Sequence, residues 1–435
     1  MKSIPVIAVV ALGFAAALVQ AQIVIKNQGF VPFADAPIRY RSENLADPIA
    51  KLQKQLDRGE IALEYEPGHG YLRSVLRALG IAVSSQTLVF SKTSFQYPKI
   101  SPEKPRALYF NDDVYVGQVH DGAALEFVSF DPMQGAIFYI LDEHRVDRPR
   151  FERAELDCVQ CHVAATPTRG VPGVMLRSVF TSPSGTQAGG TPSFITGHDS
   201  PLKERWGGWY VTGAAGKQTH MGNTVVSGPG SSKRVDGALD TTPFLASSSD
   251  IVAHLVLAHQ TQMHNLITQT NYQTRLALYA EEARNKTQNL SAGTISEAAR
   301  QRFERPAEAL VRYLLFAGEA PLEDRVEGGS GFAEEFAAKG PRDAQGRSLR
   351  EFDLRKRIFK YPCSYLIYSE AFDAIPNPAK DYIYRRLFEV LSGREQGPEF
   401  ASLSGEDRRA ILEILVATKP GVARGMEAVH TSSQP

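Results

Sequence analysis

Cysteine is scarce in this chain, because only three of the 435 residues are cysteine. That number is too small for a scaffold held together by several disulfides. Lysine plus arginine equals aspartate plus glutamate, at 48 each, so the sequence carries no electrostatic footprint of a nucleic-acid partner. Beyond the N-terminal segment no apolar run approaches the roughly 20 residues of a membrane span, and we expect the mature chain to have none. No fixed-period repeat is present.

Two of the three cysteines stand together in Cys158-Val159-Gln160-Cys161-His162. A Cys-x-x-Cys-His motif is the attachment signature of a c-type haem. Both sulfurs can add across the haem vinyl groups, and one helical turn brings His162 round to the iron. The motif therefore predicts one covalent haem c, held by Cys158 and Cys161, with His162 as the proximal iron ligand.

Two other interpretations of the same residues remain open. A structural zinc site needs about four ligands, and the third cysteine, Cys363, lies roughly two hundred residues away. A thioredoxin-like redox pair or a disulfide is the other interpretation, although its usual βαβ context is not evident here. Cys363 itself is expected to be a small buried side chain rather than a reactive thiol.

The N-terminus predicts export. Met1-Lys2 is followed by an apolar run from Ile4 to Val19, and Val19-Gln20-Ala21 fits cleavage after Ala21. We therefore expect residues 1–21 to be a signal peptide and the protein to be periplasmic or otherwise exported, with a retained anchor as the alternative. Export agrees with the motif, because haem is attached to such cysteines outside the cytoplasm.

The remaining chain divides into four regions and predicts an α+β fold. Residues 22–149 are expected to form helices between about Asp47 and Gly80 and then an antiparallel β-meander of three or four strands within 107–141. Residues 150–247 are a loop-rich haem-binding region, and residues 248–419 a mainly helical region. Within the latter we expect helices at about 250–285, 295–316, 349–370, 379–391 and 406–417, with a linker at 321–346. Residues 420–435 are expected to be a disordered tail.

The second axial ligand of the iron has three candidates. His220 and Met221 follow His162 by nearly sixty residues within the loop-rich region. His259 falls near the centre of an apolar stripe on the helix that begins near Asp250, whereas His254 and His264 fall outside that stripe. The alternative for His259 is a histidine that is hydrogen-bonded in the core, which is the more common role of a lone inward-facing histidine.

Four arginines just before the cysteines are candidates to pair with the haem propionates, because guanidinium groups match carboxylates. A solvated surface face is the alternative. These arginines are Arg145, Arg148, Arg150 and Arg153.

The motif and the export signal resemble the c-type cytochromes as a broad class. This resemblance covers five residues plus the signal segment, and it implies electron transfer through the haem, with redox partner proteins. The alternative is a haem enzyme, an oxidoreductase, or a small-ligand sensor whose open distal iron binds peroxide or nitric oxide. The chain's size favours this alternative, whereas the absence of a second Cys-x-x-Cys-His counts against two-haem peroxidase chemistry.

Overall fold

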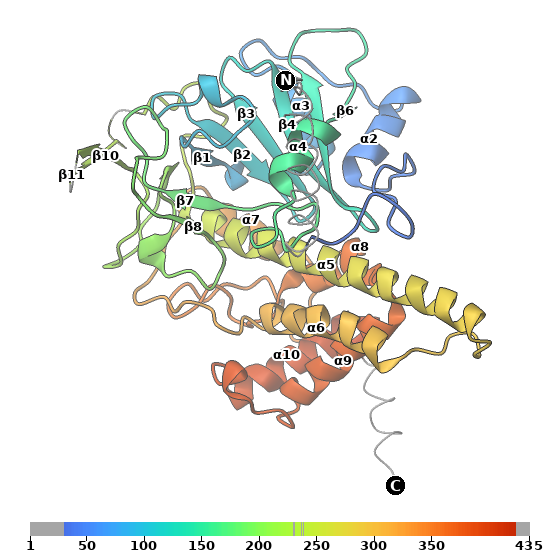
Figure 1. Cartoon of the computed structure of the whole chain (residues 1–435). Coiled ribbons are helices and arrows are strands. Elements are labelled where there is room, and N and C mark those ends of the chain that lie inside the picture. The colour runs from blue at the N-terminus through green and yellow to red at the C-terminus, as the bar shows by residue number, and fades with distance from the viewer. Residues whose placement is uncertain (1–29, 229–230, 236, 238, 423–435) are drawn as a thin grey trace, which may run out of the picture.

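The computed structural model describes residues 30–228, 231–235, 237 and 239–422. The signal peptide and most of the tail predicted above lie outside these residues. The described chain is a mixed α+β fold, as predicted, with an N-terminal antiparallel sheet and a C-terminal helical region (Figure 1). No helix in this part of the chain combines the length and apolar character needed to cross a membrane.

A seven-stranded sheet dominates the N-terminal half, with strand order β6-β5-β4-β3-β2-β1-β9. Its strands are β1 (Thr87–Val89), β2 (Arg106–Phe110), β3 (Val114–Val119), β4 (Ala124–Asp131), β5 (Gly135–Asp142), β6 (Glu152–Arg153) and β9 (Trp209–Tyr210). Every pairing is antiparallel. The predicted meander corresponds to β2–β5, to which β1, β6 and β9 add edges that the sequence pattern did not reveal.

Both faces of this sheet are covered, because successive side chains of a strand point to opposite sides. On one face Phe110, Tyr115 and Phe138 join the large core that contains the C-terminal helices. On the other face Tyr109 and Phe127 join a second core. The two cores explain why the central strands are almost continuously apolar.

The second core is closed by α2 (Pro48–Asp57) and α3 (Leu72–Ala78), both within the predicted helical stretch. The carboxylate of Asp47 accepts hydrogen bonds from the amides of Ile49 and Ala50, which caps α2. Gly80, at φ +65°, follows α3 and ends its helical path.

The region from 150 to 247 consists mostly of irregular backbone, as predicted, interrupted by one short helix and small strand pairs. These are α4 (Glu155–His162), β7 (Arg177–Val179) with β8 (Ser193–Ile195), and β10 (Thr224–Gly228) with β11 (Ser231–Arg234). The cysteine motif thus ends a helix that directly follows β6, at the edge of the sheet.

The long helix α5 (Ile251–Thr287) runs between the sheet and the other helices (Figure 1). Asp250 caps it with hydrogen bonds to the amides of Val252 and Ala253. The first 18 residues of α5 are buried on all sides, so the predicted single stripe was wrong for this part of the helix. His254 and His264 are as buried as His259, because α5 is a central element rather than a surface helix.

The remaining helices are α6 (Glu297–Leu314), α7 (Phe332–Ala338), α8 (Glu370–Asp373), α9 (Asn377–Leu391) and α10 (Gly405–Thr418). Helices α6, α9 and α10 agree with the sequence-based prediction. Helix α7 lies in the segment predicted as a linker. The helix predicted over 349–370 was wrong for most of its length, because residues 352–359 form a tight hairpin-like turn with Leu354 at φ +55°.

Candidate cofactor site

The cysteine motif occupies the second half of α4. Cys158 is half-buried, where it packs against the large core, and Cys161 is exposed. Residues three apart in a helix lie on one side of it, so Cys158 and Cys161 share one side of α4.

His162 is the last residue of α4 and its ring is fixed at two points. Its Nδ1 lies 3.0 Å from the carbonyl oxygen of Gly173, and the ring centroid is 4.8 Å from that of Phe138 on β5. A carbonyl can only accept, so Nδ1 carries the proton and Nε2 keeps its lone pair. Metal-binding histidines commonly have this arrangement, in which the other ring nitrogen donates to a carbonyl.

The electrostatic surroundings keep the His162 ring neutral. Burial lowers its pKa, the hydrogen bond to Gly173 acts in the opposite direction, and the nearby charges of Arg106 and Glu126 lower and raise it respectively. A neutral imidazole is the form that binds a metal ion.

Asn265 of α5 fixes the segment that receives the His162 hydrogen bond. Its Oδ1 accepts from the amide of Val174 at 3.0 Å, and its Nδ2 donates to the carbonyls of Val174 at 2.7 Å and Pro167 at 3.2 Å. A Cβ atom on Gly173 would lie 2.1 Å from Asn265 Oδ1. Glycine is therefore required where this segment crosses α5.

His220 and Met221 lie in the loop region after β9 and make contacts of their own. Nδ1 of His220 accepts a hydrogen bond from the amide of Gly222 at 3.0 Å, and its ring meets Trp206 edge-on at 5.2 Å. The hydroxyl of Ser178 donates to the sulfur of Met221 at 3.6 Å.

His259 is completely buried, and both of its ring nitrogens are hydrogen-bonded. Nδ1 lies 2.9 Å from Nδ1 of His198, and Nε2 lies 2.8 Å from the hydroxyl of Ser364. Its ring stacks between Tyr313 and Phe316. These contacts fit the core-histidine interpretation left open above, and a role for His259 as iron ligand would require one of its two hydrogen bonds to be broken.

The geometry does not support the two alternatives to haem, which are a structural zinc site and a thioredoxin-like or disulfide cysteine pair. Within the described residues, no group of three or more histidine, cysteine, aspartate or glutamate side chains is placed to hold a metal ion. Cys363 is buried in the large core. The cysteine pair begins at the fourth residue of α4 rather than at its N-terminus, and the neighbouring sheet is antiparallel, unlike the βαβ setting of a thioredoxin-like pair.

The four arginines proposed as propionate partners do not form one group. Arg145, Arg148 and Arg150 are exposed, and Arg150 pairs with Asp57. Arg153 donates to the carbonyl of Ser42 at 3.0 Å and to that of Tyr40, on the far side of the sheet from α5. The solvated-surface interpretation therefore accounts for the first three.

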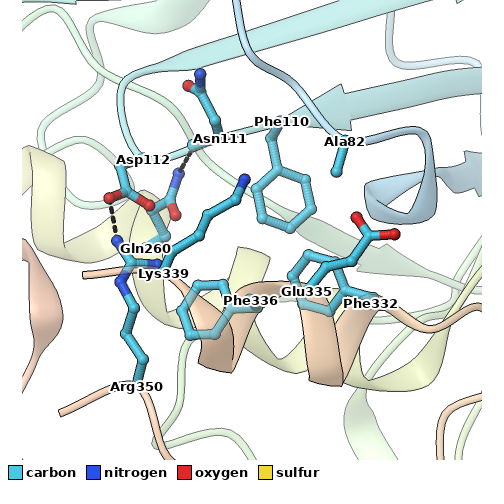
Figure 2. A pocket seen from close by; sticks show the side chains of 10 residues that line it. All are labelled: Ala82, Phe110, Asn111, Asp112, Gln260, Phe332, Glu335, Phe336, Lys339 and Arg350. Atoms are coloured by element: carbon cyan, nitrogen blue, oxygen red, sulfur yellow. Dashed lines mark hydrogen bonds and ion pairs between the residues drawn. The ribbon is translucent and has the colours of Figure 1, made fainter. Parts of the chain in front are cut away.

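A pocket between the sheet and α7 lies away from the motif (Figure 2). Figure 2 shows the ion pair between Arg350 and Asp112 at one wall, with Phe332 and Phe336 at another. Its wall residue Phe110 is in register with Tyr115, Val128 and Phe138 across the sheet. Three strand spacings separate Phe110 from Phe138, about 14 Å, so this pocket is not part of the His162 site.

Gly173 and Phe138 contact His162, and Asn265 holds the segment that follows Gly173. None of the three was recognised from the sequence. The one available signal was the position of Gly173, eleven residues after His162, since glycine marks places where two backbones approach closely. No family model, curated protein or solved structure matches this chain. The interpretation of the site therefore depends on the chemistry of these residues alone.

Proposed function

We propose that the protein is an exported single-haem c-type cytochrome that transfers electrons to or from redox partner proteins. The observation that supports this most is the Cys158–His162 motif on α4, with the Nδ1 proton of His162 directed to Gly173 and its Nε2 left as the donor atom. No other motif in the chain has comparable chemical specificity.

Each residue has a separate role in this proposal. Cys158 and Cys161 form thioethers with the haem, His162 Nε2 binds the iron, and Gly173 fixes the imidazole tautomer. Phe138 sets the position of the ring from the sheet side. The haem itself supplies reversible one-electron chemistry, and the protein tunes it by axial ligation, hydrogen bonding and burial.

The test is an optical spectrum of protein exported in cells that carry the haem-ligation machinery. We expect a haem that stays attached after acid–acetone extraction, and its loss from a Cys158→Ala/Cys161→Ala protein but not from Cys363→Ala. We also expect His162→Ala to lose the normal spectrum. Wild-type protein without haem, or a normal spectrum in His162→Ala, would disprove the assignment.

A haem enzyme or small-ligand sensor is the second candidate. Two of the candidate distal ligands already use ring nitrogens in hydrogen bonds: His259 uses both, and His220 uses Nδ1. This favours an iron whose distal position is open. Carbon monoxide separates the two functions, because it binds ferrous haem only where an axial position is open or weakly held. An unchanged low-spin spectrum supports electron transfer, whereas a shifted one supports binding of peroxide or nitric oxide.

A further inference from the structure

Three aliphatic side chains on the core-facing side of the sheet are only half-buried. They are Leu108 on β2, Val128 on β4 and Ile140 on β5. Val128 is in register with Phe138, the residue that contacts His162. Leu108 and Val128 pack at the edge of the same core as Cys158. An apolar surface exposed next to a candidate site is typical of a place where a ligand lies.

One row of paired residues across these strands contains a glycine, Gly117, and so lacks a side chain at that position. Leu108 pairs with Gly117, Gly117 with Glu126, and Glu126 with Ile140. The guanidinium of Arg106 fills the space above the glycine, since a Cβ atom on Gly117 would lie 2.3 Å from it. The glycine thus allows an arginine to lie flat against the sheet.

Arg106 has a hydrogen-bond donor to spare at this position. Its Nη2 pairs with Glu126 at 2.5 Å, and the two side chains are 18% and 14% exposed. Glu126 also accepts from the hydroxyl of Ser94 and the amide of Gln96. The Nε–H of Arg106 is buried and has no partner among the described residues, and such a group costs free energy unless something accepts its proton.

We infer that the haem ring lies against the half-buried side chains of Val128 and Ile140, next to Phe138, and that Arg106 is the cation that binds one of its propionates. The inference rests on the proposed function. Gly117 and Ile140 are two strands apart, about 10 Å, so the guanidinium lies to one side of Val128 and Ile140 rather than between them. In this proposal Arg106 replaces the arginines before the cysteines as the propionate partner.

The test compares holoproteins made with the ligation machinery: wild type, Arg106→Gln and Gly117→Ala. The matched control is Arg153→Gln, since Arg153 also lies in this sheet but on its opposite face. Arg106→Gln removes a positive charge that disfavours ferric iron, so we expect several-fold less reduced haem at a fixed applied potential. A propionate without its partner should also titrate in the working range, making the potential depend on pH.

Gly117→Ala tests the same contact without changing any charge. It should displace the guanidinium, and we expect it to change the potential in the same direction by a smaller amount. Arg106→Lys, which keeps the charge but not the flat donor geometry, should lie between wild type and Arg106→Gln. Arg153→Gln should leave both the potential and its pH dependence unchanged.

The outcomes distinguish this inference from the function on which it rests. Attached haem with the same potential and pH profile in Arg106→Gln as in wild type would overturn the inference and leave the cytochrome assignment intact. Wild-type protein without attached haem would overturn both. Should Arg106→Gln not accumulate, the Gly117→Ala and Arg106→Lys comparisons give the same decision.

Discussion

His162 and Asn265 are linked through one short segment of backbone. His162 donates to the carbonyl of Gly173, and Asn265 holds the amide and carbonyl of the next residue, Val174. The orientation of the motif histidine is thus determined by a side chain of α5, about a hundred residues further along the chain. The cysteine motif and the helical region are parts of one structural unit.

Asn265→Ala should weaken this connection. The variant leaves the buried amide of Val174 without its acceptor, and we expect unfolding to require about 2–4 kcal/mol less free energy. Urea unfolding followed by circular dichroism measures this, and the Soret band of the holoprotein should broaden as the imidazole loses its fixed orientation. The control is Gln269→Ala, which removes a half-buried contact to the carbonyl of Arg169 in the same loop and should cost less than about 1 kcal/mol. Equal losses in the two variants would contradict the role given to Asn265.

The three thiols should differ in their reactivity. Cys161 is exposed, whereas Cys363 is 0% exposed and burial raises its pKa to about 12. Because the thiolate is the reactive form, we expect iodoacetamide to label Cys161 of the haem-free protein under native conditions and Cys363 only after denaturation. Mass spectrometry of digested protein locates the labels. In the holoprotein neither Cys158 nor Cys161 should react, and native labelling of Cys363 would show that its place in the core is wrong.

His264 should make stability depend on pH. Burial lowers its pKa to about 3, and its Nε2 donates to the carbonyl of Asp112 at 2.8 Å. The folded pKa is below the unfolded value of about 6.5. Stability is therefore complete above about pH 6.5 and is lost as the pH falls towards about 3, at up to about 1.4 kcal/mol per pH unit.

His264→Gln isolates this contribution, because the glutamine amide can replace the Nε2 donor but does not titrate. Urea unfolding measures the difference in the free energy of unfolding between wild type and variant. We expect this difference to decrease by about 2 kcal/mol as the pH falls from 6.5 to 5. Carboxyl groups whose pKa burial raises to about 7, such as Asp113 and Glu319, titrate in both proteins and cancel in the difference. A difference that stays constant with pH would refute the prediction.

Among the helix-capping residues, Asp250 should be the one whose replacement lowers the free energy of unfolding most. One carboxylate oxygen accepts from the amides of Val252 and Ala253, and the other accepts from the amides of Gly329 and Ser330. Asp250→Ala leaves these donors unpaired, and we expect a loss of about 3 kcal/mol or more. Ser296→Ala removes the cap of α6, which makes one such bond to Ala299, and should cost about 1 kcal/mol. Thermal and urea unfolding of both variants test whether Asp250→Ala loses more stability than Ser296→Ala.

Local signals were sufficient for much of the fold. Asp47 before Pro48 and Gly80 after Ala78 bounded two helices, and Asp250 marked the start of α5, because capping depends on neighbours in sequence. The meander strands were also recognisable, since their apolar runs are separated by turn residues such as Asp121-Gly122. The prediction of a helix over 349–370 was wrong, because the turn at Leu354 is held by contacts that the helical composition of this segment does not reveal.

The sequence alone was enough to predict covalent haem at Cys158, Cys161 and His162, because a motif of five neighbouring residues is a local property. It also determined most helix starts and the meander, for the same reason. Only the tertiary structure decided that His162 donates to Gly173 and that both nitrogens of His259 are engaged. It also placed Arg106 over Gly117 beside the motif. These contacts join residues between 11 and 105 positions apart, and such pairings depend on how the whole chain packs rather than on any local pattern.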